Sequence, residues 1–260
     1  MTNPVATHDV VIIGAGPAGL TTAARLASHG HDVLVLEEHP EVGRPVHCTG
    51  VLGLEAFDEL DLPRQSILAI TGEASFRYGH GEPVCVETDR IKAAIVDRGV
   101  FDGALAVRAC EAGAVIRTQS RVDALTVDAS GVTVRVRGDE APIRARVCVL
   151  ACGANYRFNQ ELGLGVPRAF VQTAQLEMPF AELPRIDIRL GRDLAPGGFA
   201  WAVPFTRDGV PFARLGLFCD SDAARRFQAF TARMAFESDI DPASMPEPRL
   251  KMLPLGPVKR

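Results

Sequence analysis

The sequence predicts an α/β protein with two parts: a doubly wound unit that carries a β-meander, and a second domain that is mainly β. A strand–helix–strand pattern occupies residues 9–37, and three short strands separated by turn residues follow at residues 122–151. We expect the first domain to combine residues 1–60 with 90–165 and the second to combine 61–89 with 166–250. Five prolines in residues 241–260 predict an extended connector there, and we expect residues 251–260 to be the truncated end of that connector.

The first strand and its turn are the most informative part of the chain. Val10–Ile13 is an unbroken apolar run, which is typical of a parallel strand buried on both faces. Three glycines follow in the pattern G-x-G-x-x-G. Gly14 permits a tight turn, Gly16 lets a pyrophosphate approach the backbone, and Gly19 lets the helix pack closely on the strand.

The helix and the second strand complete the unit. Apolar residues recur at helical spacing up to Gly30, and a strand at Val33–Leu36 ends at Glu37, whose carboxylate can accept hydrogen bonds from a ribose. The helix N-terminus offers free N–H groups and a positive dipole to a pyrophosphate. Since strand, glycines, helix, strand and acid occur in this order, we predict a dinucleotide site rather than a ligand-free glycine turn.

Composition limits the remaining function classes. The net charge of −4 and the lack of a basic run argue against nucleic acid as a partner. The first residues do not resemble a signal peptide, and no run of 18 apolar residues could cross a membrane. The six cysteines lack metal-ligand or disulfide spacing, so we expect no metal, a reduced environment and a cytoplasmic location. Small apolar packing is the expected role of Cys148 and Cys152.

The next elements extend the doubly wound pattern. Phe101, Leu105, Ala109 and Ala112 fall on one helical face, and a short strand follows Gly113. The expected strands of the meander and of the second domain are 122–127, 132–136, 143–151, 75–78, 84–87, 186–190, 200–204 and 212–219.

Two motifs narrow the class. GRPVHCTG at residues 43–50 and PGGFAWAVP at residues 196–204 are similar to the geranylgeranyl reductase family, FAD-dependent oxidoreductases with the para-hydroxybenzoate hydroxylase fold. The resemblance implies a Rossmann-like FAD-binding domain followed by a substrate domain, with FAD in the first site and NAD(P)H as a possible electron donor. The residues that it places at the cofactor are Gly14, Gly16, Pro17, Ala18, Gly19, Glu37, Glu38, Arg44 and Arg98.

The chain departs from this family pattern at three places. Cys152-Gly153 stands where family members commonly have Asp-Gly, and Val203 replaces an aromatic residue. The chain also ends before the Gly-Asp-Ala-Ala turn that closes the FAD site of the family, so we expect it to correspond to the N-terminal two-thirds of a flavoenzyme. The segment 220–224 does not replace that turn; Ser221 is the expected N-cap of a helix with acidic residues in its first turn.

Five residues in the two motifs are candidates for chemistry or substrate contact. Cys48 could gate or protonate at the flavin, or it could be a buried inert thiol. We expect His47 to be a solvent-facing loop residue, and the alternative is that it donates a proton. Phe199 and Trp201 alternate and so share one face of a strand, where they either line an apolar substrate cavity or form ordinary core; Pro204 belongs to the same motif and is included in the substrate site.

The resemblance implies reduction of isoprenoid C=C bonds by hydride transfer from reduced flavin. A prenyl lipid substrate and peripheral contact with a membrane follow from the family. Two alternatives remain open at this point: an FAD-dependent aromatic monooxygenase, and a truncated, non-catalytic nucleotide-binding fragment.

Overall fold

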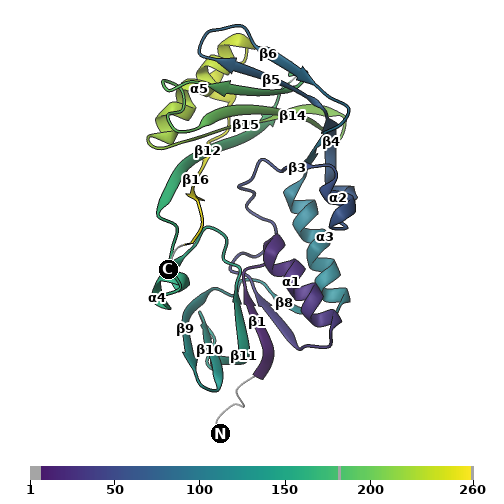
Figure 1. Ribbon diagram of the computed structural model, residues 1–260, viewed down its shortest axis with the longest axis vertical. Helices are drawn as coiled ribbons and strands as arrows, with labels where there is room; N and C mark the ends of the chain where they lie inside the picture. The colour runs from purple at the N-terminus through teal and green to yellow at the C-terminus, as the bar shows by residue number, and fades with distance from the viewer. Residues whose placement is uncertain (1–6, 181–182, 259–260) are drawn as a thin grey trace. The chain divides into compact units, whose positions relative to one another are not determined.

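The computed structural model describes residues 7–180 and 183–258, and these divide into two compact units (Figure 1). Of the described residues, unit 1 comprises 7–46 and 98–166, and unit 2 comprises 47–97, 167–180 and 183–258. The predicted α/β class is confirmed, because unit 1 combines helices with a mostly parallel sheet and unit 2 is mainly β.

Unit 1 contains a six-stranded sheet with the strand order β8-β2-β1-β11-β10-β9. β1, β2, β8 and β11 are parallel, while β9, β10 and β11 form an antiparallel meander. Its elements are β1 (Thr7–Ile13), α1 (Pro17–Ser28), β2 (Val33–Leu36), α3 (Arg98–Glu111), β8 (Val115–Arg117), β9 (Val122–Asp128), β10 (Gly131–Val136), β11 (Ile143–Leu150) and α4 (Arg157–Glu161).

The core of unit 1 explains the apolar runs. Val11 and Ile13 of β1 pack with Leu34 and Leu36 of β2 against buried residues of the meander. The alternate residues of these strands are buried too, because α1 and α3 lie side by side along the parallel strands (Figure 1). Burial on both faces is the reason that the strands read as continuous runs instead of alternating ones.

Unit 2 contains a seven-stranded sheet with the order β16-β12-β15-β14-β13-β5-β6 and a three-stranded sheet with the order β3-β7-β4. The pair β13–β5 is parallel and the other pairs are antiparallel. The elements are β3 (Val51–Gly53), α2 (Ala56–Glu59), η1 (Arg64–Ser66), β4 (Ile67–Thr71), β5 (Glu73–Tyr78), β6 (Val84–Glu87), β7 (Ala93–Val96), β12 (Ala169–Pro179), β13 (Ile186–Leu190), β14 (Phe199–Arg207), β15 (Val210–Cys219), α5 (Ala223–Glu237), η2 (Pro242–Ser244) and β16 (Arg249–Leu255).

The two faces of the large sheet have different partners. On one face, alternate residues of β12, β14 and β15 pack against Phe227, Phe230 and Met234 of α5, which runs along these strands (Figure 1). On the other face, Val203 and Phe205 pack against Ile95 of β7 and residues of β4. Successive side chains of a strand point to opposite faces of the sheet, so each residue of β14 can be assigned to one of these two cores.

The structure differs from the sequence predictions at three places. β3 and β7 pair with each other, so residues 47–60 and 90–97 lie in unit 2 rather than in the first domain. Residues 249–255 form β16 on the edge of the large sheet, where the predicted connector stood, because their backbone pairs with β12 over seven residues. The N-cap of α5 is Asp222 in a left-handed conformation (φ 58°), not Ser221, and no acidic residue lies in the first turn.

Candidate functional site

The glycine turn, Gly14–Gly19, is set by close packing at its two ends. Gly14 has φ +105°, and a Cβ there would lie 2.4 Å from the Ala151 carbonyl oxygen. A Cβ on Gly19 would lie 2.0 Å from the Gly14 carbonyl oxygen. Neither position can hold a larger residue without a shift of the backbone. The turn therefore needs these two glycines for its own conformation.

Gly16 differs from both, since a Cβ built on it would meet no atom within 4 Å. Its φ of −81° is one that any residue adopts. Gly16 is also the N-cap of α1, followed by Pro17 at the first helical position, and no side chain caps the helix. The first N–H groups of α1, including that of the exposed Ala18, are therefore open to an anion. A bare backbone facing open space at a helix N-terminus fits a pyrophosphate.

Glu37 follows β2 and turns its carboxylate toward the glycine turn. Its Oε2 accepts a hydrogen bond of 2.8 Å from the Ala15 N–H. Its Oε1 accepts one of 3.0 Å from the His39 N–H and lies 2.6 Å from His39 Nδ1. A carboxylate has about four acceptor positions, so Oε2 retains capacity for a ribose hydroxyl. Glu38 is exposed and lies 3.9 Å from Arg121, a distance typical of a loose surface pair.

The two predicted arginines of unit 1 lie in different environments. Arg44 is exposed, and its Nε is 3.5 Å from Glu41 Oε1. Arg98 donates two hydrogen bonds, of 3.1 and 2.8 Å, to the buried carboxylate of Asp102. Burial raises the pKa of Asp102, and the hydrogen bonds from Arg98 oppose that rise. Gly43 packs against this pair, since a Cβ there would lie 3.0 Å from Asp102 Cβ. The start of the GRPVHCTG motif is thus seated on α3.

The two cysteines near the end of β11 are packing residues. Cys148 and Cys152 both pack against the core of unit 1, which confirms the packing role expected from the sequence. Cys152 Sγ lies 3.6 Å from the Ile13 carbonyl oxygen. Burial raises the pKa of Cys148 to about 12 and that of Cys152 to about 11. Both thiols are therefore neutral at physiological pH, and Cys152 cannot replace the carboxylate of the family pattern.

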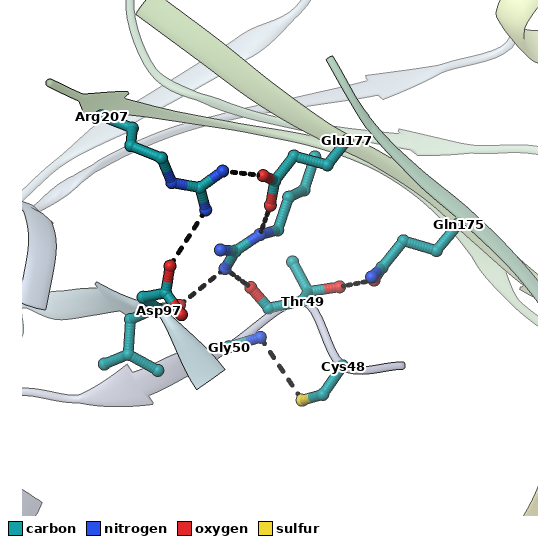
Figure 2. A network of polar contacts seen from close by, with 9 residues as sticks. Cys48, Thr49, Gly50, Asp97, Gln175, Glu177 and Arg207 are labelled. Carbon is teal, nitrogen blue, oxygen red and sulfur yellow. Dashed lines mark hydrogen bonds and ion pairs between the residues drawn. The ribbon is translucent and has the colours of Figure 1, made fainter. Parts of the chain in front are cut away.

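Figure 2 shows the thiol turn, Cys48–Gly50, which lies in unit 2. Its Cys48 is exposed. The alternative of a buried, inert thiol is therefore wrong for Cys48. The Gly50 N–H donates to Cys48 Sγ at 3.3 Å, and Thr49 Oγ1 donates to Gln175 Oε1 of β12 at 2.7 Å. His47, just before the turn, is exposed, as its loop position predicted. Among the three residues of the thiol turn, Cys48 is the one that is exposed and carries a nucleophilic side chain.

An aromatic cluster of Phe199, Trp201 and Phe218 lies on the face of the large sheet opposite α5. Phe199 makes edge contacts with Phe218 and Trp201, with ring centroids at 4.6 and 5.8 Å. Gly216 lies beneath the indole, since a Cβ there would be 2.1 Å from Trp201 Cζ2. All three rings are half-buried. Phe199 and Trp201 thus share a face as predicted.

Pro204 does not join this cluster. It pairs in register with Ala213, whose side chain belongs to the core under α5. The alternation of β14 places Pro204 on that same side, away from Phe199 and Trp201. The structure therefore separates one member of the predicted substrate set from the other two.

The sequence analysis missed four residues around the GRPVHCTG motif: Asp102, Gln175, Glu177 and Arg214. The first, second and fourth contact the motif, and Glu177 bonds Arg214. One signal was present: Arg214 interrupts the otherwise apolar strand VPFARLGLFC, where a charged residue in the middle of the strand has no packing value. Its hydrogen-bond partners lie 37, 118 and 165 residues away and could not be identified without the fold.

A glycine turn at a helix N-terminus, next to a strand that ends in a carboxylate, defines the class of dinucleotide-binding α/β proteins. The family model described as Lycopene cyclase protein matches residues 9–214, more than half of the chain, and the chain belongs to this family.

Two further comparisons extend this result. The chain is 31% identical over 206 residues to digeranylgeranylglycerophospholipid reductase of Methanocaldococcus jannaschii, covering 76% of this chain and 52% of the relative. The fold matches a geranylgeranyl bacteriochlorophyll reductase-like protein from Thermoplasma acidophilum with a TM-score of 0.80 at 23% identity, covering 95% of this chain and 66% of that one.

A third match is a myxobacterial FAD-dependent halogenase, with a TM-score of 0.70 at 22% identity over 96% of this chain and 64% of the other. These findings confirm the resemblance to the geranylgeranyl reductases that the two motifs indicated. The chain spans about half of the length of the curated relative it matches.

Proposed function

We propose that this chain is the cofactor- and substrate-binding part of an FAD-dependent oxidoreductase that reduces C=C bonds of isoprenoid chains. The observation that carries the proposal is the open backbone at Gly16, beside the Glu37 carboxylate, in a chain whose curated relatives are named as reductases of a digeranylgeranyl lipid. Gly14 and Gly19 shape the turn, Pro17 and Ala18 present the helix N-terminus, and Glu37 accepts from the ribose of FAD.

The remaining predicted cofactor residues have weaker support. Arg98, held by Asp102, is the better candidate for the pyrophosphate region because its guanidinium is oriented by two hydrogen bonds. Arg44 and Glu38 are exposed and are proposed only as outer contacts of the cofactor. FAD, when bound and reduced, would supply a hydride to the alkene, with NAD(P)H as the proposed electron donor.

The chain's own part in the reaction is to hold the alkene, exclude water and supply a proton. Phe199 and Trp201 offer a half-buried aromatic surface, which suits a prenyl chain. Pro204 is omitted from this surface because it lies on the other side of β14. Cys48 is the proposed proton donor to the second alkene carbon, since its thiol is exposed and can reach a bound substrate.

Prenyl lipids reside at membranes, so the proposal includes transient contact with a membrane surface from the cytoplasmic side. Across the described ranges 7–180 and 183–258, no helix is long and apolar enough to span a bilayer.

The test starts with the visible absorption spectrum of the purified chain after incubation with FAD and gel filtration. We expect a retained flavin spectrum, followed by saturation of a digeranylgeranylglycerol phospholipid when the protein is photoreduced under anaerobic conditions. Free FAD without protein is the control. Oxygen-dependent hydroxylation of an aromatic compound would instead identify a monooxygenase, and a colourless protein would identify a nucleotide-binding fragment that does not retain flavin.

A further inference from the structure

Arg214 is the most buried charged residue among those described, with 1% of its surface exposed in the middle of β15. Its Nε donates to Glu177 Oε2 at 2.8 Å, and its Nη1 donates to the carbonyl oxygens of Thr49 and Val96 at 2.6 and 2.8 Å. Its guanidinium also lies over the Phe205 ring at 4.6 Å. A buried guanidinium is stable only when its N–H groups are satisfied, and here two of the acceptors belong to other segments of unit 2.

A second arginine completes this network, which we call the arginine network (Arg214, Glu177, Arg207 and Asp97). Arg207 donates to the other oxygen of Glu177, and its Nη2 lies 3.2 Å from Asp97 Oδ2 (Figure 2). Burial raises the pKa of Glu177, but the hydrogen bonds from Arg207 and Arg214 outweigh burial and hold the pKa below its ordinary value. Glu177 is thus ionised at neutral pH and fixes both guanidinium groups.

Arg214 is the member of the arginine network that contacts the thiol turn. Gly50 has φ +69°, and a Cβ there would lie 2.7 Å from the Val96 carbonyl oxygen and 3.0 Å from Arg214 Nη1. The Gly50 carbonyl accepts from the Val96 N–H at 2.8 Å, while Arg214 holds the Thr49 carbonyl. With Thr49 and Gly50 both fixed, the Gly50 N–H is aimed at Cys48 Sγ.

We propose that Arg214, held by Glu177, is a positioning residue for Cys48: it anchors the thiol turn so that the Gly50 N–H supports the sulfur of an outward-facing thiol. The catalytic meaning of this assignment rests on the proposed function, in which Cys48 supplies a proton. Arg214 itself acts only through the backbone of the turn.

A second buried arginine in the same sheet offers a matched control. Arg189 of β13 is 7% exposed and bonds Asp187 and Glu237 at 2.7 and 2.6 Å. It lies over Phe230 of α5, on the opposite face of the sheet from the thiol turn. Loss of either arginine removes a buried, paired charge of unit 2, but only Arg214 contacts the thiol turn.

The test measures the second-order rate of Cys48 alkylation by iodoacetamide at fixed pH, followed by peptide mass spectrometry. The parent carries Cys85→Ser and Cys110→Ser, which remove the other two exposed thiols. We expect Arg214→Met to lower the rate about fivefold, the factor that corresponds to one net hydrogen bond. Cys48 is exposed in the parent, so a change in access is expected to contribute little to the rate. Arg189→Met is expected to stay within about twofold of the parent.

Two variants that keep Arg214 protect the test against misfolding of Arg214→Met. Gly50→Ala places a methyl group against Arg214 Nη1 and Val96, and Thr49→Val removes only the bond to Gln175. Both variants should lower the alkylation rate of Cys48, and the decrease should be smaller for Thr49→Val. Equal rates in parent, Gly50→Ala and Thr49→Val, or equal losses in Arg214→Met and Arg189→Met, would overturn the proposal. Because no flavin is present, the result is independent of flavin retention and of the proposed function.

Discussion

The glycine turn and the thiol turn are both short backbone segments whose conformation depends on glycine, yet they are stabilised in different ways. Residues 14–19 are held mainly by their own strand, helix and next strand: Glu37 accepts from the Ala15 N–H, and Ala151, just after β11, packs against Gly14 and Gly19. Residues 48–50 are held by Val96, Gln175 and Arg214. A local motif specifies the first turn, whereas the tertiary fold specifies the second. Substitutions within the glycine turn should therefore disrupt its conformation, whereas substitutions far away in the sequence should also disrupt the thiol turn.

The largest expected effect concerns Glu37. Glu37→Arg places a cation where a ribose hydroxyl must be accepted and removes the acceptor of the Ala15 N–H. We expect no FAD to remain bound after gel filtration, measured by absorbance relative to protein. Glu140→Arg, an exposed change of the same charge in the same unit, is the control and should retain the parent's flavin content. Equal flavin in Glu37→Arg and parent would contradict a ribose contact at this position.

The glycines of the turn should separate folding from binding. Gly19→Ala forces a Cβ to 2.0 Å from the Gly14 carbonyl oxygen, and we expect it to cost about 3 kcal/mol of unfolding free energy, in the range of overpacked cores. Gly16→Ala meets open space and should leave stability within about 0.5 kcal/mol, since its backbone conformation is an ordinary one.

Flavin retention gives the second measurement on the same pair. Gly16→Ala should weaken FAD binding although the protein is fully folded, because the methyl group occupies the space in front of the helix N-terminus. Urea denaturation measures the stability of both variants, and titration with FAD measures their affinity for the cofactor. Unchanged flavin affinity in Gly16→Ala would show that the pyrophosphate lies elsewhere.

Much of the fold could be read from the sequence because its signals are local. Apolar runs, turn residues and the spacing of three glycines gave β1, α1, β2 and the meander nearly as observed. β16 was missed because its prolines resemble a connector, and its strand character comes from pairing with β12. The boundary at residue 60 was displaced for the same reason: β3 is three residues long and is defined by its pairing with β7.

The candidate site also contains one part that could be predicted from the local sequence and one part that could not. The Gly16 and Glu37 geometry followed from an ordered local pattern, but the anchoring of Cys48 did not. Arg214 and Glu177 are cross-strand neighbours on β15 and β12, a relation that exists only once the strand register is known. Likewise, the placement of Pro204 away from Trp201 depends on which face of β14 each residue occupies. Pairings over long sequence distances carry no signal in a single sequence.

A pH measurement sharpens the role of Glu177. Because its pKa in the folded protein is lowered from 4.5, its contribution to stability is present above pH 4.5 and is lost as the pH falls through the folded pKa. Glu177→Gln should therefore cost roughly 1–2 kcal/mol at pH 7, a value discounted for the partial exposure of the side chain. The difference from the parent should shrink below pH 4. Urea denaturation at several pH values measures this, with exposed Glu82→Gln as the control. A penalty that is constant with pH would show that the charge of Glu177 is not what matters.

The smallest expected effect tests whether the glycine-turn site is as local as its contacts suggest. His39 Nδ1 lies 2.6 Å from Glu37 Oε1, but the same oxygen also accepts from the His39 backbone N–H, and the His39 side chain is 44% exposed. His39→Ala removes one of two restraints on that oxygen and leaves the Ala15 contact intact. We expect FAD affinity, followed by quenching of flavin fluorescence, to fall less than about fivefold, in keeping with one partly exposed hydrogen bond. A loss as large as that of Glu37→Arg would contradict this, because it would mean that the orientation of the carboxylate depends on the imidazole rather than on the backbone of the turn.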